Sequence, residues 1–227
     1  MRRSVFTLAL VIPFIAVCAS RASAGAITTR TDLQTILGGP GTLEDFESFV
    51  IAAGDAAFID CHTLSSSSIC NGQGPGLVVG GVEFTPANGL DDLQWDGAGY
   101  FGAPSQELLS GGSLIVDFTT FVNAFGVDLR DFEGFNSTAT MTIYGLDDAT
   151  IIGTFPGLLL SNAPVFAGWS DTSGIGKIVL GGSQVWSPII DNLEFGTAAV
   201  PEPGTALLFG FGVSALGVLR RRAQRRL

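Results

Sequence analysis

Alternating apolar and polar side chains in the middle of the chain constrain its fold more than any other feature. In one segment, Ala139, Met141 and Ile143 share one face of an extended chain, and threonines occupy the other face. The same period of two recurs in residues 114–118 and 125–129. This pattern is typical of half-buried strands in antiparallel sheets. Further strands are expected in residues 43–49, 77–85, 150–155, 164–169, 175–181 and 188–195.

Turn signals separate these short strands along a chain that contains 31 glycines. About nine short strands with frequent turns predict an all-β fold, an antiparallel β-sandwich. Only two short helices are expected, in residues 30–37, with Thr31 or Asp32 near the N-cap, and in residues 105–109. The expected turns are residues 71–72, 88–89, 146–148 and 181–182.

The N-terminus has the three parts of a secretory signal peptide. Two arginines follow Met1, residues 5–17 are largely apolar, and residues 22–24 (Ala-Ser-Ala) form a small-residue cleavage site. We therefore expect export and removal of residues 1–24. A lipoprotein attached through Cys18 is the alternative, but the valine before this cysteine stands where a lipobox needs a small residue.

The C-terminus combines an apolar run with a basic cluster. Residues 204–219 carry no charge, and residues 220–227 contain five arginines. This order predicts a single transmembrane helix whose C-terminal end stays in the cytoplasm. The helix would be about 24 Å long, which is short against a hydrocarbon core of about 30 Å and favours a temporary anchor. An ordinary tail anchor is the alternative.

The part between the two ends, residues 25–199, is long enough for one domain with its own core. It holds three basic residues, Arg30, Arg130 and Lys177, and twenty acidic ones, which gives a net charge of −17. Such a charge repels nucleic acid and other anionic polymers, and it attracts divalent cations. Solubility and self-repulsion outside the cell are the simpler interpretation of the same charge.

Two cysteines remain after removal of the signal peptide, Cys61 and Cys70. An even pair in an oxidising compartment predicts one disulfide. A metal site that includes the adjacent His62 is the alternative, but the sequence around it lacks enough ligands at suitable spacing.

The C-terminal 28 residues also resemble a known sorting signal. Residues 201–203 are Pro-Glu-Pro, and the apolar run and the arginine cluster follow in that order. This combination is similar to the PEP-CTERM sorting domain and covers residues 200–227 only. The resemblance implies export by a Gram-negative bacterium that makes exopolysaccharide, transient anchoring in the inner membrane, and processing by an exosortase near Pro201, Glu202 and Pro203. It places the protein in the cell envelope, at the cell surface or in the extracellular matrix.

A second resemblance concerns residues 43–47 (Leu-Glu-Asp-Phe-Glu) and 190–193 (Ile-Asp-Asn-Leu). They are similar to the terminal strands of jelly-roll carbohydrate-binding modules that contain calcium. The resemblance implies a jelly-roll-like sandwich in which the first and last strands meet, with Glu47 and Asp191 as ligands of a structural Ca²⁺. Carboxylates capped by backbone N–H groups are the alternative.

Aromatic side chains in residues 91–102 suggest a carbohydrate-binding surface, because sugar rings stack their apolar faces on aromatic rings. Trp95, Tyr100 and Phe101 lie there beside Asp and Gln side chains that accept hydrogen bonds from hydroxyls. Trp169 and Trp186 are further candidates. The alternative for each ring is a place in the core.

Enzyme motifs are weak in this chain. It has no Gly-x-Ser-x-Gly, and His62 is its only histidine, so a Ser-His-Asp triad is not expected. The match to Gly-x-Gly-x-x-Gly at residues 97–102 lacks the strand and helix that a dinucleotide site needs. We expect an exported, noncatalytic surface or extracellular-matrix protein that associates with exopolysaccharide and binds carbohydrate. A secreted carbohydrate-active enzyme and a purely structural matrix protein are the alternatives.

Overall fold

The computed structural model describes residues 24–87, 92–131, 137–182 and 186–199, which lie in one compact unit, Ala22–Ala199. The expected signal sequence up to Ser23, the motif at 201–203, the membrane helix at 204–219 and the turn at 88–89 lie outside the described residues. Within the described ranges, no helix is long and apolar enough to cross a membrane.

The described residues form β-strands, one α-helix and a 3₁₀ turn at Tyr100–Gly102. The helix is α1 (Arg30–Leu37). The strands are β1 (Gly25–Ile27), β2 (Thr42–Glu44), β3 (Ala56–Phe58), β4 (Leu64–Ser65), β5 (Val82–Pro86), β6 (Leu93–Asp96), β7 (Glu107–Ser110), β8 (Leu114–Arg130), β9 (Thr138–Tyr144), β10 (Ile151–Leu159), β11 (Val165–Gly182) and β12 (Ile189–Gly196).

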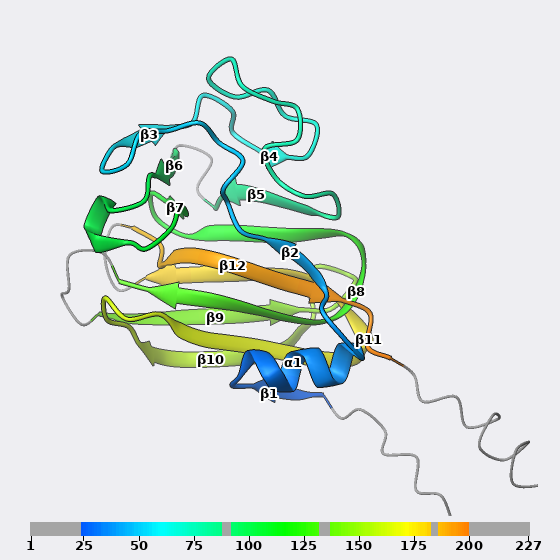
Figure 1. Ribbon diagram of the computed structural model, residues 1–227. Helices are drawn as coiled ribbons and strands as arrows, with labels where there is room; N and C mark the ends of the chain where they lie inside the picture. The colour runs from blue at the N-terminus through cyan, green and yellow to red at the C-terminus, as the bar shows by residue number, and fades with distance from the viewer. Residues whose placement is uncertain (1–23, 88–91, 132–136, 183–185, 200–227) are drawn as a thin grey trace, which may run out of the picture. The chain divides into compact units, whose positions relative to one another are not determined.

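Hydrogen bonds join these strands into one antiparallel network that folds over into two layers (Figure 1). The first layer has the order β4-β5-β8-β11-β9-β10 and uses the beginning of β8 and the end of β11. The second layer has the order β3-β6-β7-β12-β8-β11-β1, with β2 also beside β12. The all-β antiparallel fold expected from the alternation is confirmed, and the arrangement is sandwich-like.

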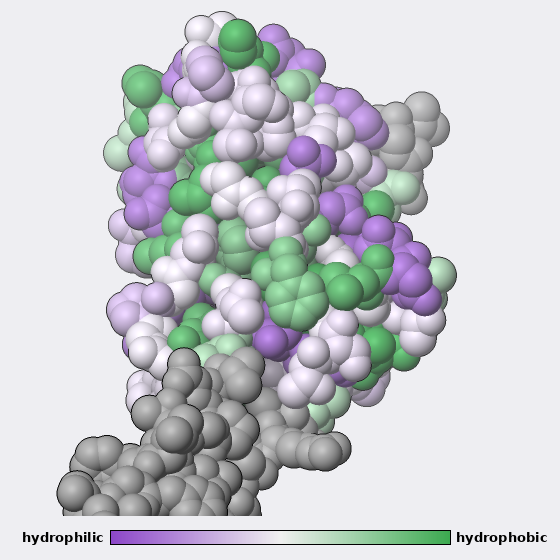
Figure 2. Space-filling model, turned by 90° about the vertical axis from the view of Figure 1, so that its right-hand side faces the viewer, coloured by the Kyte–Doolittle hydropathy of each residue, from purple (hydrophilic) through white to green (hydrophobic). Residues whose placement is uncertain are grey.

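Two long strands, β8 and β11, pass from one layer to the other. The core residues of β8 are even-numbered up to Val122 and odd-numbered from Phe125, and the exposed residues 119–121 interrupt the alternation just before this change. In β11 the register shifts between Ser170 and Ile175. Such irregularities let a strand bend at a corner and join two packed layers. Figure 2 shows the face that contains the β8 corner, where hydrophobic residues lie among hydrophilic ones.

The long strands merge segments that the sequence predicts as separate. The expected strands at 114–118 and 125–129 are the two ends of β8, and those at 164–169 and 175–181 belong to β11. The expected turn at 181–182 is wrong, because both glycines pair with β9 in the ladder. The expected turn at 71–72 is confirmed, since Cys70 and Gln73 exchange two backbone hydrogen bonds across it.

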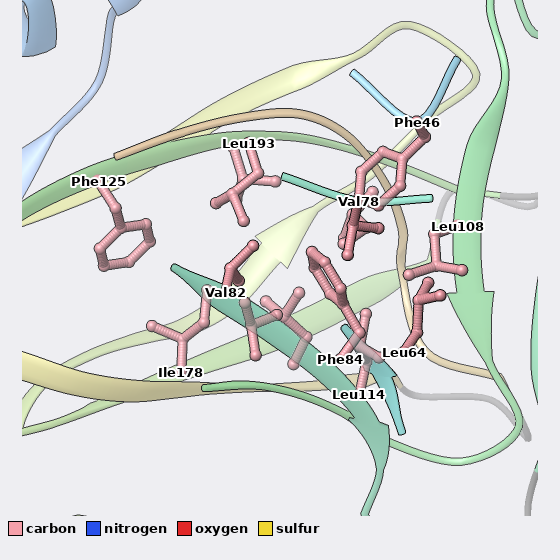
Figure 3. Close-up of a cluster of buried hydrophobic side chains, with 14 of the residues drawn as sticks. Phe46, Leu64, Val78, Val82, Phe84, Leu108, Leu114, Phe125, Ile178 and Leu193 are labelled. Atoms are coloured by element: carbon pink, nitrogen blue, oxygen red, sulfur yellow. The ribbon is translucent and has the colours of Figure 1, made fainter. Parts of the chain in front are cut away.

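The hydrophobic core lies between the two layers (Figure 3). Phe84 and Ile178 come from the first layer, Leu108 and Leu193 from the second, and Phe46 from the segment that follows β2. Phe84 and Phe46 meet edge to face, with ring centroids 5.3 Å apart. Since each buried aliphatic or aromatic side chain stabilises the fold by about 1.5–3 kcal/mol, this cluster dominates the folding energy.

The helix expected at 30–37 is confirmed and packs on the outer face of the second layer. Leu33 is fully buried and forms a small cluster with Ile27 and Ala124. The N-cap is Thr29, whose side chain accepts a hydrogen bond from the backbone N–H of Asp32, and not Thr31 or Asp32 as expected.

The helix expected at 105–109 is wrong, because Glu107–Ser110 form β7. Leu108 is buried in the core between β6 and β12, and its strand neighbours alternate with it. Hydrogen bonding to β6 and β12 therefore made this segment a strand, because it is too short for a local preference for helix to decide its conformation.

Candidate functional site

The outer face of the second layer carries a row of charged side chains. Strand register places Asp96 opposite Glu107 and Asp191 opposite Asp128, on neighbouring pairs of strands. The local cause is alternation, as in Leu93-Gln94-Trp95-Asp96, where every second residue faces the core. Both arginines of the exported part, Arg30 and Arg130, have ion-pair partners on this face.

Arg130 and Glu107 form a buried ion pair at the centre of this row. Their side chains are 2% and 1% exposed, and both Nε and Nη2 of Arg130 donate to the carboxylate. Asp96 is 0% exposed. Its Oδ1 accepts from Gln94 Nε2 at 2.7 Å, and its buried Oδ2 has no hydrogen-bond partner among the described residues.

Burial controls the ionisation of these two acids. It raises the pKa of Asp96 from 3.8 to about 6, against the opposing effects of the Gln94 hydrogen bond and the Arg130 charge. Burial also raises the pKa of Glu107 although Arg130 lowers it. One guanidinium thus faces two buried carboxyl groups, and Asp96 is the one without an ion pair among the described residues.

Arg130 also holds the turn that contains two of the predicted carbohydrate contacts. Its Nη1 donates to the backbone oxygen of Phe101 at 3.1 Å, and Nη2 donates to that of Tyr100 at 3.5 Å. Phe101 takes a left-handed conformation with φ of 47°, and the rings of Tyr100 and Phe101 meet edge to face with centroids 4.4 Å apart. Both side chains are half-buried.

The third predicted contact, Trp95, belongs to the core, so its expected place on a sugar-binding platform is wrong. It is 0% exposed, its Nε1 donates to the backbone oxygen of Phe46 at 3.0 Å, and it stacks on Phe49 at 5.0 Å. Trp169 is half-buried and packs against Phe155 across the layers. The Trp95 indole therefore offers no open face of the kind that a sugar ring needs.

The two predicted calcium ligands lie beside consecutive residues of one segment. Glu47 accepts from the backbone N and the Nε2 of Gln106 at 2.8 and 3.1 Å. Asp191 accepts from Ser105 Oγ at 2.6 Å and from the backbone N of Asn192 at 2.7 Å. Burial raises the pKa of Asp191 to about 6. The expected meeting of the two segments is confirmed, because β2 pairs with β12.

Calcium binding by Glu47 and Asp191 stays a prediction. Each carboxylate already accepts two hydrogen bonds or more within the domain. Among the residues that the structure describes, no three His, Cys, Asp or Glu side chains are grouped to hold a metal ion. A cation would therefore have to draw its other ligands from backbone, amide or water oxygens, which calcium accepts.

Arg30 joins α1 to the irregular part of β12. Its guanidinium donates to Glu194 at 2.9 Å, to Asp128 at 3.0 Å and to the backbone oxygen of Asn192 at 2.9 Å. It also lies over the ring of Phe166, 5.1 Å from the centroid. Sequence reasoning missed this contact set, although the scarcity of basic residues among twenty acidic ones is a signal that each one has a structural task.

The predicted disulfide between Cys61 and Cys70 is present, with Cα atoms 5.4 Å apart. The next residue, Asn71, donates from Nδ2 to the backbone oxygen of Phe58 at 2.9 Å and accepts at Oδ1 from the backbone N of Asp60, also at 2.9 Å. The turn at Cys70–Gln73 is therefore fixed to the segment after β3 by a covalent bond and by side-chain hydrogen bonds.

Comparison with protein families gives one match. Residues 199–226 match the PEP-CTERM protein-sorting motif. No curated protein matches the chain. The motif is that of exported proteins that an exosortase sorts at the envelope of Gram-negative bacteria. The chain is therefore an exported protein with this sorting signal, and its described part is an antiparallel, sandwich-like β-domain.

Proposed function

We propose that the protein is a noncatalytic component of the cell surface or the extracellular matrix, sorted by an exosortase and associated with exopolysaccharide. The observation that carries this proposal is the sorting motif at 199–226, which implies handling at the envelope. The short apolar run at 204–219 supports a temporary anchor in the inner membrane, removed by processing near Pro201–Pro203.

The charge of the domain favours solubility outside the cell. Its net charge of −17 keeps copies apart and disfavours binding to nucleic acid. Of the predicted carbohydrate contacts in residues 91–102, Tyr100 and Phe101 remain, and Arg130 fixes the backbone of their turn. The likeness to a jelly-roll carbohydrate-binding module, with Ca²⁺ at Glu47 and Asp191, belongs to the same proposal.

Fractionation of a producing strain tests this function. We expect the processed protein to sediment with the exopolysaccharide matrix, and to appear free in the medium of an isogenic strain that makes no exopolysaccharide. Equal distribution in the two strains would contradict the association. Release of reducing sugar from a panel of polysaccharides by the purified protein would instead favour the enzyme interpretation.

A further inference from the structure

An exposed aromatic pair lies at the edge of the second layer, away from the turn that contains Tyr100. Phe58 is 58% exposed and ends β3, the short edge strand (Figure 1). It stacks with Trp186, which is half-buried, at a centroid distance of 6.3 Å and an interplanar angle of 26°. The rings are thus nearly parallel, and Phe58 leaves more than half of its side chain open to solvent.

Strand register explains why these distant residues meet. Phe58 is opposite Gln94, and Gln94 is opposite Leu109, so the three residues share the outer face. Trp186 forms an isolated β-bridge with Gly111. Gly111 follows Leu109 by two residues and therefore lies on the same face of the layer. The pair therefore spans β6 and β7 on the solvent side of the layer.

Hydrogen bonds on both sides hold the pair in place. The backbone N of Ile59 donates to Leu93 at 2.9 Å, and Asn71 Nδ2 donates to the backbone oxygen of Phe58. On the other side, the backbone N of Ser187 donates to Ser110 at 2.8 Å. A surface whose backbone is already fixed loses little conformational entropy when it binds a ligand.

We propose that Phe58 and Trp186 form a stacking surface for pyranose rings of a neutral polysaccharide. Two rings present far less area than the roughly 800 Å² per partner of a stable protein interface, but they match one or two sugar units. The exposed Asp60 lies two residues after Phe58, and the exposed Asp92 accepts the N–H of Gly111 through its backbone oxygen. Carboxylates accept hydroxyl donors, although Asp60 Oδ1 already accepts from the backbone N of Asn71 at 2.5 Å. The charge of −17 repels acidic polymers.

This inference rests on the proposed association with exopolysaccharide and assigns it to a surface distinct from the Tyr100–Phe101 turn. Affinity electrophoresis of the exported protein, as the cells release it, tests the assignment with hydroxyethylcellulose and glucomannan as neutral probes and alginate as the acidic one. Phe58→Ala and Trp186→Ala should weaken retardation by a neutral polymer at least about tenfold. Phe121→Ala is the matched control, because Phe121 is 51% exposed at the β8 corner.

A spectroscopic readout separates binding from folding. Trp186→Phe keeps a ring, so the variant should still bind a neutral polymer while losing most of the ligand-induced change in tryptophan emission. Unchanged melting temperatures of the variants would show that their domains are intact. A Phe58→Ala variant that no longer folds is replaced by Phe58→Leu, which keeps an apolar side chain and removes the flat ring.

Each remaining outcome overturns the assignment. Full retardation of both alanine variants, stronger retardation by alginate than by the neutral polymers, or no retardation of the parent protein would do so. Loss of binding in Tyr100→Ala with normal binding in Phe58→Ala would place the sugar at the turn. In that case the proposed function stands and the assignment to Phe58 and Trp186 fails.

Discussion

Replacement of Asp96 by asparagine should make the stability of the domain less dependent on pH, because it removes a buried group that ionises. Asp96 is 0% exposed, and its Oδ2 has no hydrogen-bond partner among the described residues. Asparagine has the same shape and carries no charge, and its side-chain oxygen can still accept from Gln94. The substitution therefore removes a buried charge and keeps the packing.

The magnitude follows from the pKa of Asp96, which burial raises from 3.8 to about 6. A folded-state pKa above the unfolded one means that the folded domain binds the proton more tightly. The cost of the charge is thus fully present above pH 6 and disappears as the pH falls towards 3.8. The full cost is about 3 kcal/mol, and about 1.4 kcal/mol of it is relieved between pH 8 and pH 5.

Thermal melting of the parent and the Asp96→Asn variant at pH 8 and pH 5 measures this effect. The parent should be more stable at pH 5, since burial also raises the pKa of Glu44 to about 7 and that of Asp191 to about 6. The difference in Tm between pH 5 and pH 8 should be roughly 3–6 °C smaller in the variant than in the parent. Asp55→Asn, at an exposed position, controls for the net charge. Equal pH dependence of Asp96→Asn and parent would refute the reasoning.

Three further outcomes are expected. Intact-mass analysis of protein from a host with the matching exosortase should show loss of the chain after about residue 203, and retention of the five terminal arginines would contradict processing. Thiol labelling of the folded, non-reduced protein should be negligible because Cys61 and Cys70 are bonded, whereas two labelled thiols would contradict the bond. Calcium should stabilise the domain by about 2.7 kcal/mol at a hundredfold excess over its Kd, which raises the Tm, and a chelator should lower the Tm. Asp191→Asn or Glu47→Gln should abolish the response to calcium, while magnesium or sodium chloride acting equally well would indicate simple charge screening.

The alternation of apolar and polar residues predicted those strands that keep the same face buried along their whole length. The alternation of Ala139, Met141 and Ile143 predicted β9, because one face of this strand is buried along its whole length. The exposed residues 119–121 interrupt the alternation of β8 and made one strand look like two. The irregularity in β11 between Ser170 and Ile175 had the same effect. A change of parity at a corner resembles a turn until the pairing partners are known.

The candidate site was harder to predict, because its contacts join residues far apart in the chain. Arg130 and Glu107 are separated by 23 residues, and Arg30 and Glu194 by 164. No local spacing contains that information. The burial of Trp95 was accessible in principle, since Gln94 and Asp96 flank it and the period of two places it with Leu93 on the inner face. The cluster of aromatic residues in 91–102 hid this signal.

The charged row and the aromatic pair share one face, and their partners indicate which of them is available to a ligand. Glu107 is bound to Arg130, Glu194 to Arg30, and Asp191 to Ser105. A ligand that used these groups would have to replace short, partly or fully buried hydrogen bonds, at a cost that solvent-exposed groups do not incur. Phe58 is mostly exposed and offers a flat ring at the edge of the layer. The buried charges therefore fix the shape of the outer face, and the aromatic edge is where contact with a polysaccharide costs least.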